Sequence, residues 1–303
     1  MTGASRKGAA LPRHPRGWKG SVGQWLADAV FYLERRGVPE ATANAEFIMA
    51  AVLETRRNEV KLGSAHPLRE KQGFHFWELV VARGERVPLA YVLGTQNFMG
   101  LEIAVTPDVL VPRPETEELV AQAQLRLRAS GVPSPAVLEI GTGSGCIAIA
   151  LAKTFPAAVV YATESSPAAL ALAQKNAEAH GVSRRIRFID EDVFKPAVSS
   201  AGWADLLISN PPYIPSAEVA SLEPEVLREP ALALDGGPDG LCAVRAIAAQ
   251  APARLKRGGC LLLEIGCTQG AAVRDILSRS GGQEVEIRKD LQGLDRIAAA
   301  RFG

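Results

Sequence analysis

An apolar run leads into a glycine-rich turn at Val137-Leu138-Glu139-Ile140-Gly141-Thr142-Gly143-Ser144-Gly145, and a second apolar segment follows from Cys146. This order predicts a buried strand, a tight turn and a helix, because glycine lets the backbone turn sharply and approach a ligand closely. Cys146 occupies the place of the last glycine of a dinucleotide fingerprint, and the Lys-Ser/Thr pair of a P-loop is absent from the turn. We therefore interpret residues 141–145 as a candidate nucleoside site.

Three further apolar runs end in polar residues. The run 159–163 ends at Glu164, the run 186–189 leads into acids up to Asp192, and the run 204–209 ends at Asn210. In a parallel sheet the carboxyl ends of the strands gather at one edge, so we expect these side chains to line one crevice. Glu164 is suited to accept from ribose hydroxyls, and Asp192 and Val193 to lie beside an adenine ring. The alternative is that these acids cap helices or face solvent.

The pattern of the whole chain predicts an α/β fold of the Rossmann-like class in residues 114–303. Helical patterns alternate with the strands, and a fifth strand is expected at 259–265. A closing β pair at 284–288 and 295–301 would form an antiparallel carboxyl-terminal edge. The sequence Gly281-Gly282-Gln283 is interpreted as a turn before that pair.

The first part of the chain predicts a small helical domain at residues 21–86. Ser21 and Gln24 have the spacing of a capping box, and apolar residues then recur at helical spacing up to Leu33, with further helices expected at 40–54 and 67–83. Its aromatic residues could dock a partner, although such a stripe is more often core. We expect residues 87–113 to be a β-hairpin linker built from short β runs at 91–94, 96–100 and 101–105. Residues 1–20 are interpreted as a disordered leader, with an organellar transit peptide as the alternative.

Composition excludes several classes of protein. The chain has 303 residues, is 47% hydrophobic and carries a formal net charge of +1, which does not favour direct binding of nucleic acid by bulk charge. The four cysteines and four histidines show no metal-ligand spacing, so no metal is expected. No apolar run is long enough to span a membrane. We expect a cytoplasmic monomer.

The sequence Asn210-Pro211-Pro212-Tyr213 carries the chemistry. Proline cannot donate to a sheet ladder and fixes φ, so the chain should leave the strand as a stiff loop. Such a loop can hold the Asn210 side chain and the Pro211 carbonyl in a fixed relation, beside the flat face of Tyr213. Two acceptors and a ring suit a planar NH2 group, whose nitrogen needs positioning and electrostatic help to react. The alternative is a proline-terminated strand with a capping Asn.

A second motif is Pro112-Arg113-Pro114-Glu115-Thr116-Glu117. Pro114 stands where a helix can begin, with two acids in the first turn. Either this is only a well-capped helix start, or Arg113 and its neighbours also belong to the site.

At these motifs the chain resembles the PrmC/HemK family of protein-(glutamine-N5) methyltransferases, which use S-adenosyl-L-methionine to modify peptide chain release factors. The resemblance runs from about Arg86 to the end, and more loosely over the helical part. Its other carriers are Arg86-Val87-Pro88-Leu89-Ala90-Tyr91, Glu229-Pro230 and Ala233-Leu234-Asp235-Gly236-Gly237-Pro238-Asp239-Gly240-Leu241.

The resemblance implies which residues bind each molecule. The cofactor would be held by Glu139, Gly141, Thr142, Gly143, Ser144, Gly145, Glu164, Asp192, Val193 and Asn210. The glutamine of a Gly-Gly-Gln motif in the release factor would be held by Asn210, Pro211, Pro212 and Tyr213, with Arg113 nearby. Some family members carry an aromatic residue at the Val193 position, so valine implies thinner stacking on the adenine.

Three alternatives differ in substrate or class. A glutamine methyltransferase of a large-subunit ribosomal protein shares the Asn-Pro-Pro-Tyr loop but tends to show Pro-Arg-Ser-Pro at residues 112–115. Adenine-N6 methyltransferases of DNA or RNA use a similar loop and would be expected to carry a basic surface. A non-catalytic interaction protein would not need the intact loop.

Overall fold

The computed structural model describes His14 and residues 19–194 and 202–303. The chain divides into two compact units, Met1–Gly94 and Thr95–Gly303. The expected leader therefore lies largely outside the described residues. His14, which falls within it, is buried and stacks on Trp25 with ring centroids 3.6 Å apart.

The first unit is helical, as the sequence predicts. Ser21 and Gln24 form the expected capping box at the start of the first helix. The core of the unit surrounds Trp25, and Gly73 packs so closely against that ring that a Cβ there would lie 2.6 Å from it. The helices are α1 (Val22–Arg35), α2 (Ala41–Leu53), α3 (Arg57–Leu62), α4 (Glu70–Gly84) and α5 (Leu89–Leu93).

The hairpin is shorter than the sequence indicates. β1 (Thr95–Phe98) and β2 (Leu101–Ala104) pair antiparallel around Met99 and Gly100, which both have positive φ, as in a type I′ turn. The β run expected at 91–94 was wrong, because that segment forms the end of α5. Pro88 can start a helix and Gly94 ends it in the left-handed conformation, so the local signals favoured one helical turn.

The second unit contains a mixed seven-stranded sheet, with strand order β5-β4-β3-β6-β7-β9-β8 in the described residues. The first five of these strands are parallel, and β9 and β8 form the expected antiparallel edge. Chain order reverses between β3 and β6, which is the switch point at which such sheets bind ligands. The predicted fold class is confirmed. The strands are β3 (Ala136–Ile140), β4 (Val159–Glu164), β5 (Ile186–Asp190), β6 (Ala204–Ser209), β7 (Leu255–Glu264), β8 (Gln283–Lys289) and β9 (Asp295–Phe302).

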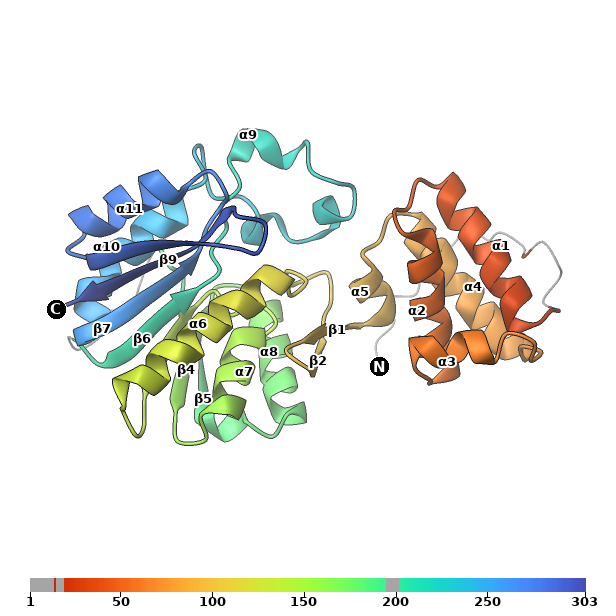
Figure 1. Cartoon of the computed structure of the whole chain (residues 1–303), viewed down its shortest axis with the longest axis horizontal. Coiled ribbons are helices and arrows are strands. Elements are labelled where there is room, and N and C mark those ends of the chain that lie inside the picture. Colours follow the sequence, from red (N-terminus) through yellow and green to blue (C-terminus); the bar gives the residue numbers. More distant parts are fainter. Residues whose placement is uncertain (1–13, 15–18, 195–201) are drawn as a thin grey trace. The chain divides into compact units, whose positions relative to one another are not determined.

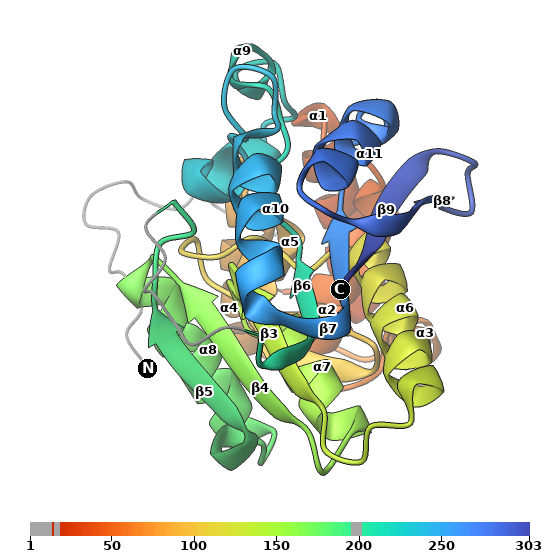
Figure 2. The ribbon, with the colours of Figure 1, turned by 90° about the vertical axis from the view of Figure 1, so that its left-hand side faces the viewer.

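Helices cover both faces of this sheet (Figures 1 and 2). Neighbouring strand residues point to opposite faces, so Val137 packs on one helical layer and Leu138 on the other. One layer contains α6 (Pro114–Ser130), α7 (Cys146–Thr154) and α8 (Pro167–Ala179), and the other contains α10 (Cys242–Arg254) and α11 (Gly270–Arg279). The segment between β6 and α10 holds the short helix α9 (Ser216–Val219) and the 3₁₀ turns η2 (Val226–Arg228) and η3 (Ala231–Ala233); a third 3₁₀ turn, η1 (Ser183–Arg185), precedes β5.

Within the described ranges, the helices are all too short or too polar to cross a membrane.

Candidate active site

A cavity of about 420 Å³ opens at the carboxyl ends of β3, β4, β5 and β6, within the second unit. It brings together most of the residues that the sequence singles out. The predicted residues on its wall are Gly141, Thr142, Gly143, Ser144, Glu164, Asp192, Val193, Asn210, Pro211 and Pro212. Its size lies in the range of small-molecule sites.

The glycine-rich turn forms one wall. Gly141 and Gly143 have φ of 73° and 54°, and a Cβ at either would meet nothing within 4 Å. Bare backbone therefore borders the open space. The turn is fixed from behind, because the N–H groups of Gly141 and Thr142 both donate to the Thr163 carbonyl at 2.9 Å. Gly145 is not on the cavity wall; its missing Cβ lets α7 approach Ala173 of α8.

Glu139 lies beneath this turn and is fully buried rather than on the cavity wall. Its Oε2 accepts a hydrogen bond of 2.8 Å from the Thr142 hydroxyl, and the backbone N–H of Ala148 at the start of α7 also interacts with the carboxylate. Burial raises the pKa of Glu139 to about 8, although the Thr142 bond lowers it. Glu139 thus supports the turn from below.

Glu164 stands at the end of β4, on the cavity wall. Its Oε2 accepts from the Gly143 N–H at 2.9 Å, and its Oε1 accepts from the N–H groups of Ser165 and Ser166 at the same distance. A carboxylate has about four lone-pair sites, so these three bonds, counted over the described residues, leave one on Oε2. That site is available to a hydroxyl of a ligand.

Asp192 and Val193 follow β5 on another part of the wall. Asp192 Oδ1 accepts from the Phe194 N–H at 2.9 Å, and Gln250 of α10 donates to the Val193 carbonyl at 2.8 Å. Phe194 also lines the cavity and is 56% exposed. The sequence analysis did not single out Phe194, which adds an aromatic side chain beside the valine.

The loop after β6 leaves the sheet as the two prolines predict, and several bonds fix it. Ile214 exchanges backbone hydrogen bonds with Leu234 at 3.1 Å and Gly236 at 2.8 Å. Gln269 Nε2 donates to the Tyr213 carbonyl at 2.9 Å. Ser209 Oγ donates to the Ile140 carbonyl at 2.7 Å, which ties the end of β6 to the end of β3. The loop is therefore held at the same sheet edge as the glycine-rich turn.

Asn210 begins a series of hydrogen-bonded polar side chains that the sequence analysis did not identify. Its Nδ2 donates to Thr116 Oγ1 at 3.1 Å, and Thr116 Oγ1 donates to Glu264 Oε2 at 2.7 Å. Burial raises the pKa of Glu264, at the end of β7, to about 7, against the Thr116 bond and Arg296, which lower it. Asn210 and Thr116 both line the cavity.

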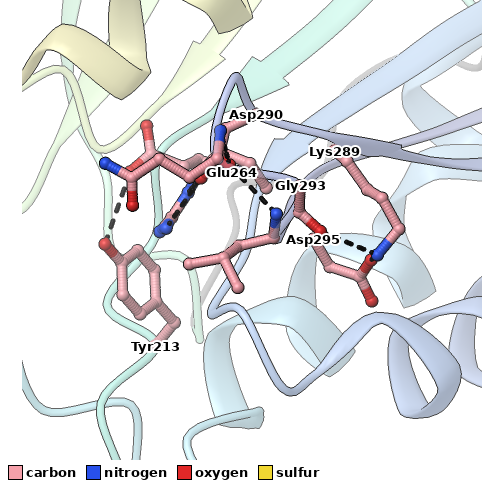
Figure 3. Close-up of polar contacts among 9 residues, drawn as sticks. Tyr213, Glu264, Lys289, Asp290, Gly293 and Asp295 are labelled. Atoms are coloured by element: carbon pink, nitrogen blue, oxygen red, sulfur yellow. Dashed lines mark hydrogen bonds and ion pairs between the residues drawn. The ribbon is translucent and has the colours of Figure 1, made fainter.

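Tyr213 is not on the cavity wall. Its hydroxyl donates to Glu264 Oε1 at 3.4 Å, beside the β8–β9 turn where Asp290 accepts from backbone N–H groups (Figure 3). Burial and the Glu264 carboxylate raise the pKa of Tyr213 to about 12, so the phenol keeps its proton. Tyr213 is therefore hydrogen-bonded to Glu264, the last residue of the series of side chains that begins at Asn210.

Arg113 is likewise not on the wall, although Pro112 beside it is. The Arg113 guanidinium pairs with the carboxylate of Glu229, whose side chain is 1% exposed. Glu229 also accepts from the Val111 N–H at 3.2 Å. This pair joins two segments that both border the cavity, one through Pro112 and the other through Pro230.

The chemistry of the cavity is that of polar acceptors on a mostly apolar wall. Among the described residues, no group of three or more His, Cys, Asp or Glu has an arrangement suited to a metal ion. Sequence reasoning missed further wall segments, because they lie in loops and turns away from the strand ends; Ala233 begins one of the quoted motifs, but that motif was not assigned to the site. These segments are Pro107, Asp108, Val109 and Leu110 before α6, and Leu232 and Ala233 in the segment after α9.

The sheet order and the cavity at its switch point define a Rossmann-like methyltransferase fold. A methyltransferase from Pyrococcus furiosus has a similar structure, with a TM-score of 0.52 and 20% identity, over 73% of this chain and 98% of that one. The hMettl16 catalytic domain superposes with a TM-score of 0.53 and 19% identity, over 75% and 82% of the two chains. Residues 118–237 match the Methyltransferase small domain.

The particular family follows from closer relatives. Residues 24–94 match the PrmC N-terminal domain. A release factor glutamine methyltransferase of Geobacter sulfurreducens is 42% identical over 273 residues, which cover 90% of this chain and 93% of that protein. The protein of the same name from Cereibacter sphaeroides is 42% identical over 278 residues, 91% and 97% of the two chains. The chain belongs to the PrmC/HemK family of release factor glutamine methyltransferases, as the resemblance predicts.

Proposed function

We propose that this protein transfers a methyl group from S-adenosylmethionine to the side-chain amide nitrogen of the glutamine in the Gly-Gly-Gln motif of peptide chain release factors. The observation that carries the proposal is that Asn210 and Pro211 line the same cavity as Gly141 and Glu164. Two hydrogen-bond acceptors suited to a planar NH2 group and a wall suited to a nucleoside therefore border the same cavity.

The residues present fit S-adenosylmethionine. Glu164 keeps one lone-pair site for a ribose hydroxyl, and bare backbone at Gly141 and Gly143 borders open space. Asp192 offers an acceptor for the adenine amino group, beside Val193 and Phe194 as apolar wall. Glu139 would act through the turn that it supports, and Gly145 through the packing of α7 on α8.

The bound cofactor supplies an electrophilic methyl group on a sulfonium. Asn210 Oδ1 and the Pro211 carbonyl accept the two N–H bonds of the glutamine amide and orient its nitrogen. With the cofactor bound, that nitrogen would take the methyl group, S-adenosylhomocysteine would remain as the leaving group, and one N–H proton of the amide would pass to water. The amide is a weak nucleophile, so alignment is the main help, worth ~7 to 11 kcal/mol in well-oriented reactions.

We assign the binding of the release factor to the helical unit, which has a hydrophobic core of its own around Trp25.

The sequence at residues 112–117 favours this substrate over a ribosomal protein, because the Pro-Arg-Ser-Pro of ribosomal-protein methyltransferases is replaced by Pro112-Arg113-Pro114-Glu115. We also propose that the enzyme acts in the cytoplasm, where translation terminates, and as a monomer.

The test is mass spectrometry of purified release factors, ribosomal proteins and DNA after incubation with the enzyme and methyl-labelled cofactor. We expect a single methyl group on the glutamine of the Gly-Gly-Gln motif. Label on a ribosomal-protein glutamine, or on adenine in DNA, would replace the proposed substrate by the corresponding alternative.

A further inference from the structure

The polar chain behind Asn210 connects three parts of the second unit. Thr116 belongs to the first turn of α6, Glu264 ends β7, and Asn210 follows β6. Thr116 and Glu264 are 3% and 1% exposed, whereas Asn210 is partly exposed at the cavity. The chain thus runs from the cavity wall into the interior.

The protons available fix the direction of these hydrogen bonds. The Thr116 hydroxyl has one proton, and an ionised Glu264 can only accept. At the 2.7 Å separation of Thr116 Oγ1 and Glu264 Oε2, that proton lies toward the carboxylate. The lone pairs of Thr116 Oγ1 stay available to accept, and the group that can donate to them is the Asn210 Nδ2 amide at 3.1 Å.

The orientation of the Asn210 carboxamide follows from this direction. With Nδ2 bonded to Thr116, Oδ1 is the opposite atom of the planar group, and no hydrogen bond from the described residues reaches it. We propose that Thr116 and Glu264 are positioning residues that hold the Asn210 carboxamide with its oxygen available to the substrate NH2. This inference rests on the proposed function for its substrate, but not for its geometry.

Protonation of Glu264 would reverse the direction of the hydrogen bonds from Glu264 through Thr116 to Asn210. A protonated carboxyl can donate to Thr116 Oγ1, which frees the hydroxyl proton to turn toward Asn210 and lets the amide flip. The NH2 group of Asn210 would then face the substrate NH2, where donor meets donor. Transfer should therefore be fast when Glu264 is ionised and slow when it is protonated.

Several groups around Glu264 influence this protonation. Arg296 of β9 and the hydrogen bonds from Thr116 and Tyr213 favour the ionised form, whereas burial and Glu115 of α6 favour the protonated form. The Cys146 thiol of α7 also lies within electrostatic range, but burial raises its pKa to about 12 and it stays neutral.

The test compares single-turnover rates of methyl transfer to a purified release factor, with S-adenosylmethionine saturating. At pH 8.5 we expect Thr116→Val, which keeps the shape and loses the hydroxyl, to lower the rate at least tenfold, with cofactor affinity unchanged within threefold by calorimetry. Thr116→Ser restores the hydroxyl and should return the rate to within threefold of the wild type. Thr154→Val is the matched control, because it removes a threonine hydroxyl bonded to Ala150 and Gln124 in α7 and α6.

The pH profile distinguishes positioning from general loss of structure. We expect the wild-type rate to rise about tenfold through an inflection near pH 7, and this inflection to vanish in Glu264→Gln. A Thr116→Val rate within threefold of the wild type, or an unchanged inflection in Glu264→Gln, would overturn the proposal.

A second readout does not depend on activity. In protein labelled with ¹⁵N-asparagine, the Asn210 side-chain resonance, assigned by its loss in Asn210→Ala, should titrate near pH 7 in the wild type and not in Thr116→Val. Absence of this titration in the wild type contradicts the proposal. If the titration is present but release factors are not methylated, the proposed substrate fails and the positioning of Asn210 stands.

Discussion

The guanidinium of Arg113 is paired with the buried carboxylate of Glu229, 116 residues later in the chain. Glu229 also accepts a hydrogen bond from the Val111 N–H. One carboxylate therefore links the segment before α6 to the segment after η2. Both segments border the cavity, through Pro112 and Pro230. The pair therefore maintains the shape of the wall from outside it.

Substitution Glu229→Ala should lower the free energy of unfolding by about 1–3 kcal/mol, because it leaves the Val111 N–H without its buried acceptor. It should also weaken cofactor and substrate binding, since two wall segments lose their connection. Urea denaturation and calorimetry measure the two effects. The matched control is Glu284→Ala, which removes an ion pair with Arg301 whose two side chains are both exposed, so a change below ~1 kcal/mol is expected. Equal effects of the two substitutions would contradict this role of Glu229.

Substitution Asn210→Ala should lower the turnover on a release factor by on the order of 10² or more, as loss of an oriented polar group does. Cofactor affinity should stay within a few fold, because Glu164 and the glycine-rich turn are unchanged. Steady-state kinetics and calorimetry separate the two quantities. Near-normal methylation by this variant would remove Asn210 from its assigned role.

Substitution Glu164→Ala should show the reverse pattern. It removes the acceptor proposed for the ribose and also the bonds from Gly143, Ser165 and Ser166, so we expect the dissociation constant of the cofactor to rise at least tenfold. Release-factor binding, measured by fluorescence anisotropy, should change less than threefold. Unchanged cofactor affinity in calorimetric titration would count against the ribose assignment.

Stability should depend on pH through Glu139. The pKa of this carboxyl is raised from 4.5 to about 8 by burial, so between these values the unfolded chain ionises while the folded protein keeps its proton. Ionisation then favours the unfolded state, and the stability that Glu139 contributes at low pH is lost as the pH rises toward 8. Glu139→Gln removes this contribution, which changes the free energy of unfolding by at most about 1.4 kcal/mol per pH unit. Denaturation at pH 5, 6.5 and 8 should show a flatter dependence in the variant; parallel curves would contradict the assignment.

The second unit should function without the first for cofactor binding. Both of its hydrophobic clusters lie within residues 95–303, and the cavity wall does too. A protein of residues 95–303 should therefore fold and bind S-adenosylmethionine within about threefold of the full chain, but lose activity on intact release factor at least tenfold. Circular dichroism, calorimetry and methylation assays test the three parts. Undiminished activity would refute the assignment of the helical unit to the substrate.

Local patterns in the sequence were enough to predict most of the secondary structure. The strand, turn and helix around residues 137–153 and the capping box at Ser21 appear as expected, because each depends on neighbours within a few residues. The error at residues 91–94 has the same origin. A short apolar run fits either a strand or one helical turn, and the flanking Pro88 and Gly94 decided for the helix.

The sequence by itself determined the fold class, the family and the residues at the strand ends, since strand ends in a parallel sheet must share one edge. The tertiary structure alone decided which groups act on those residues. Thr116 and Glu264 are 148 residues apart, and they meet because β7 lies next to β6 and α6 packs near the ends of both. Such contacts depend on the order of strands across the sheet, which no local pattern specifies.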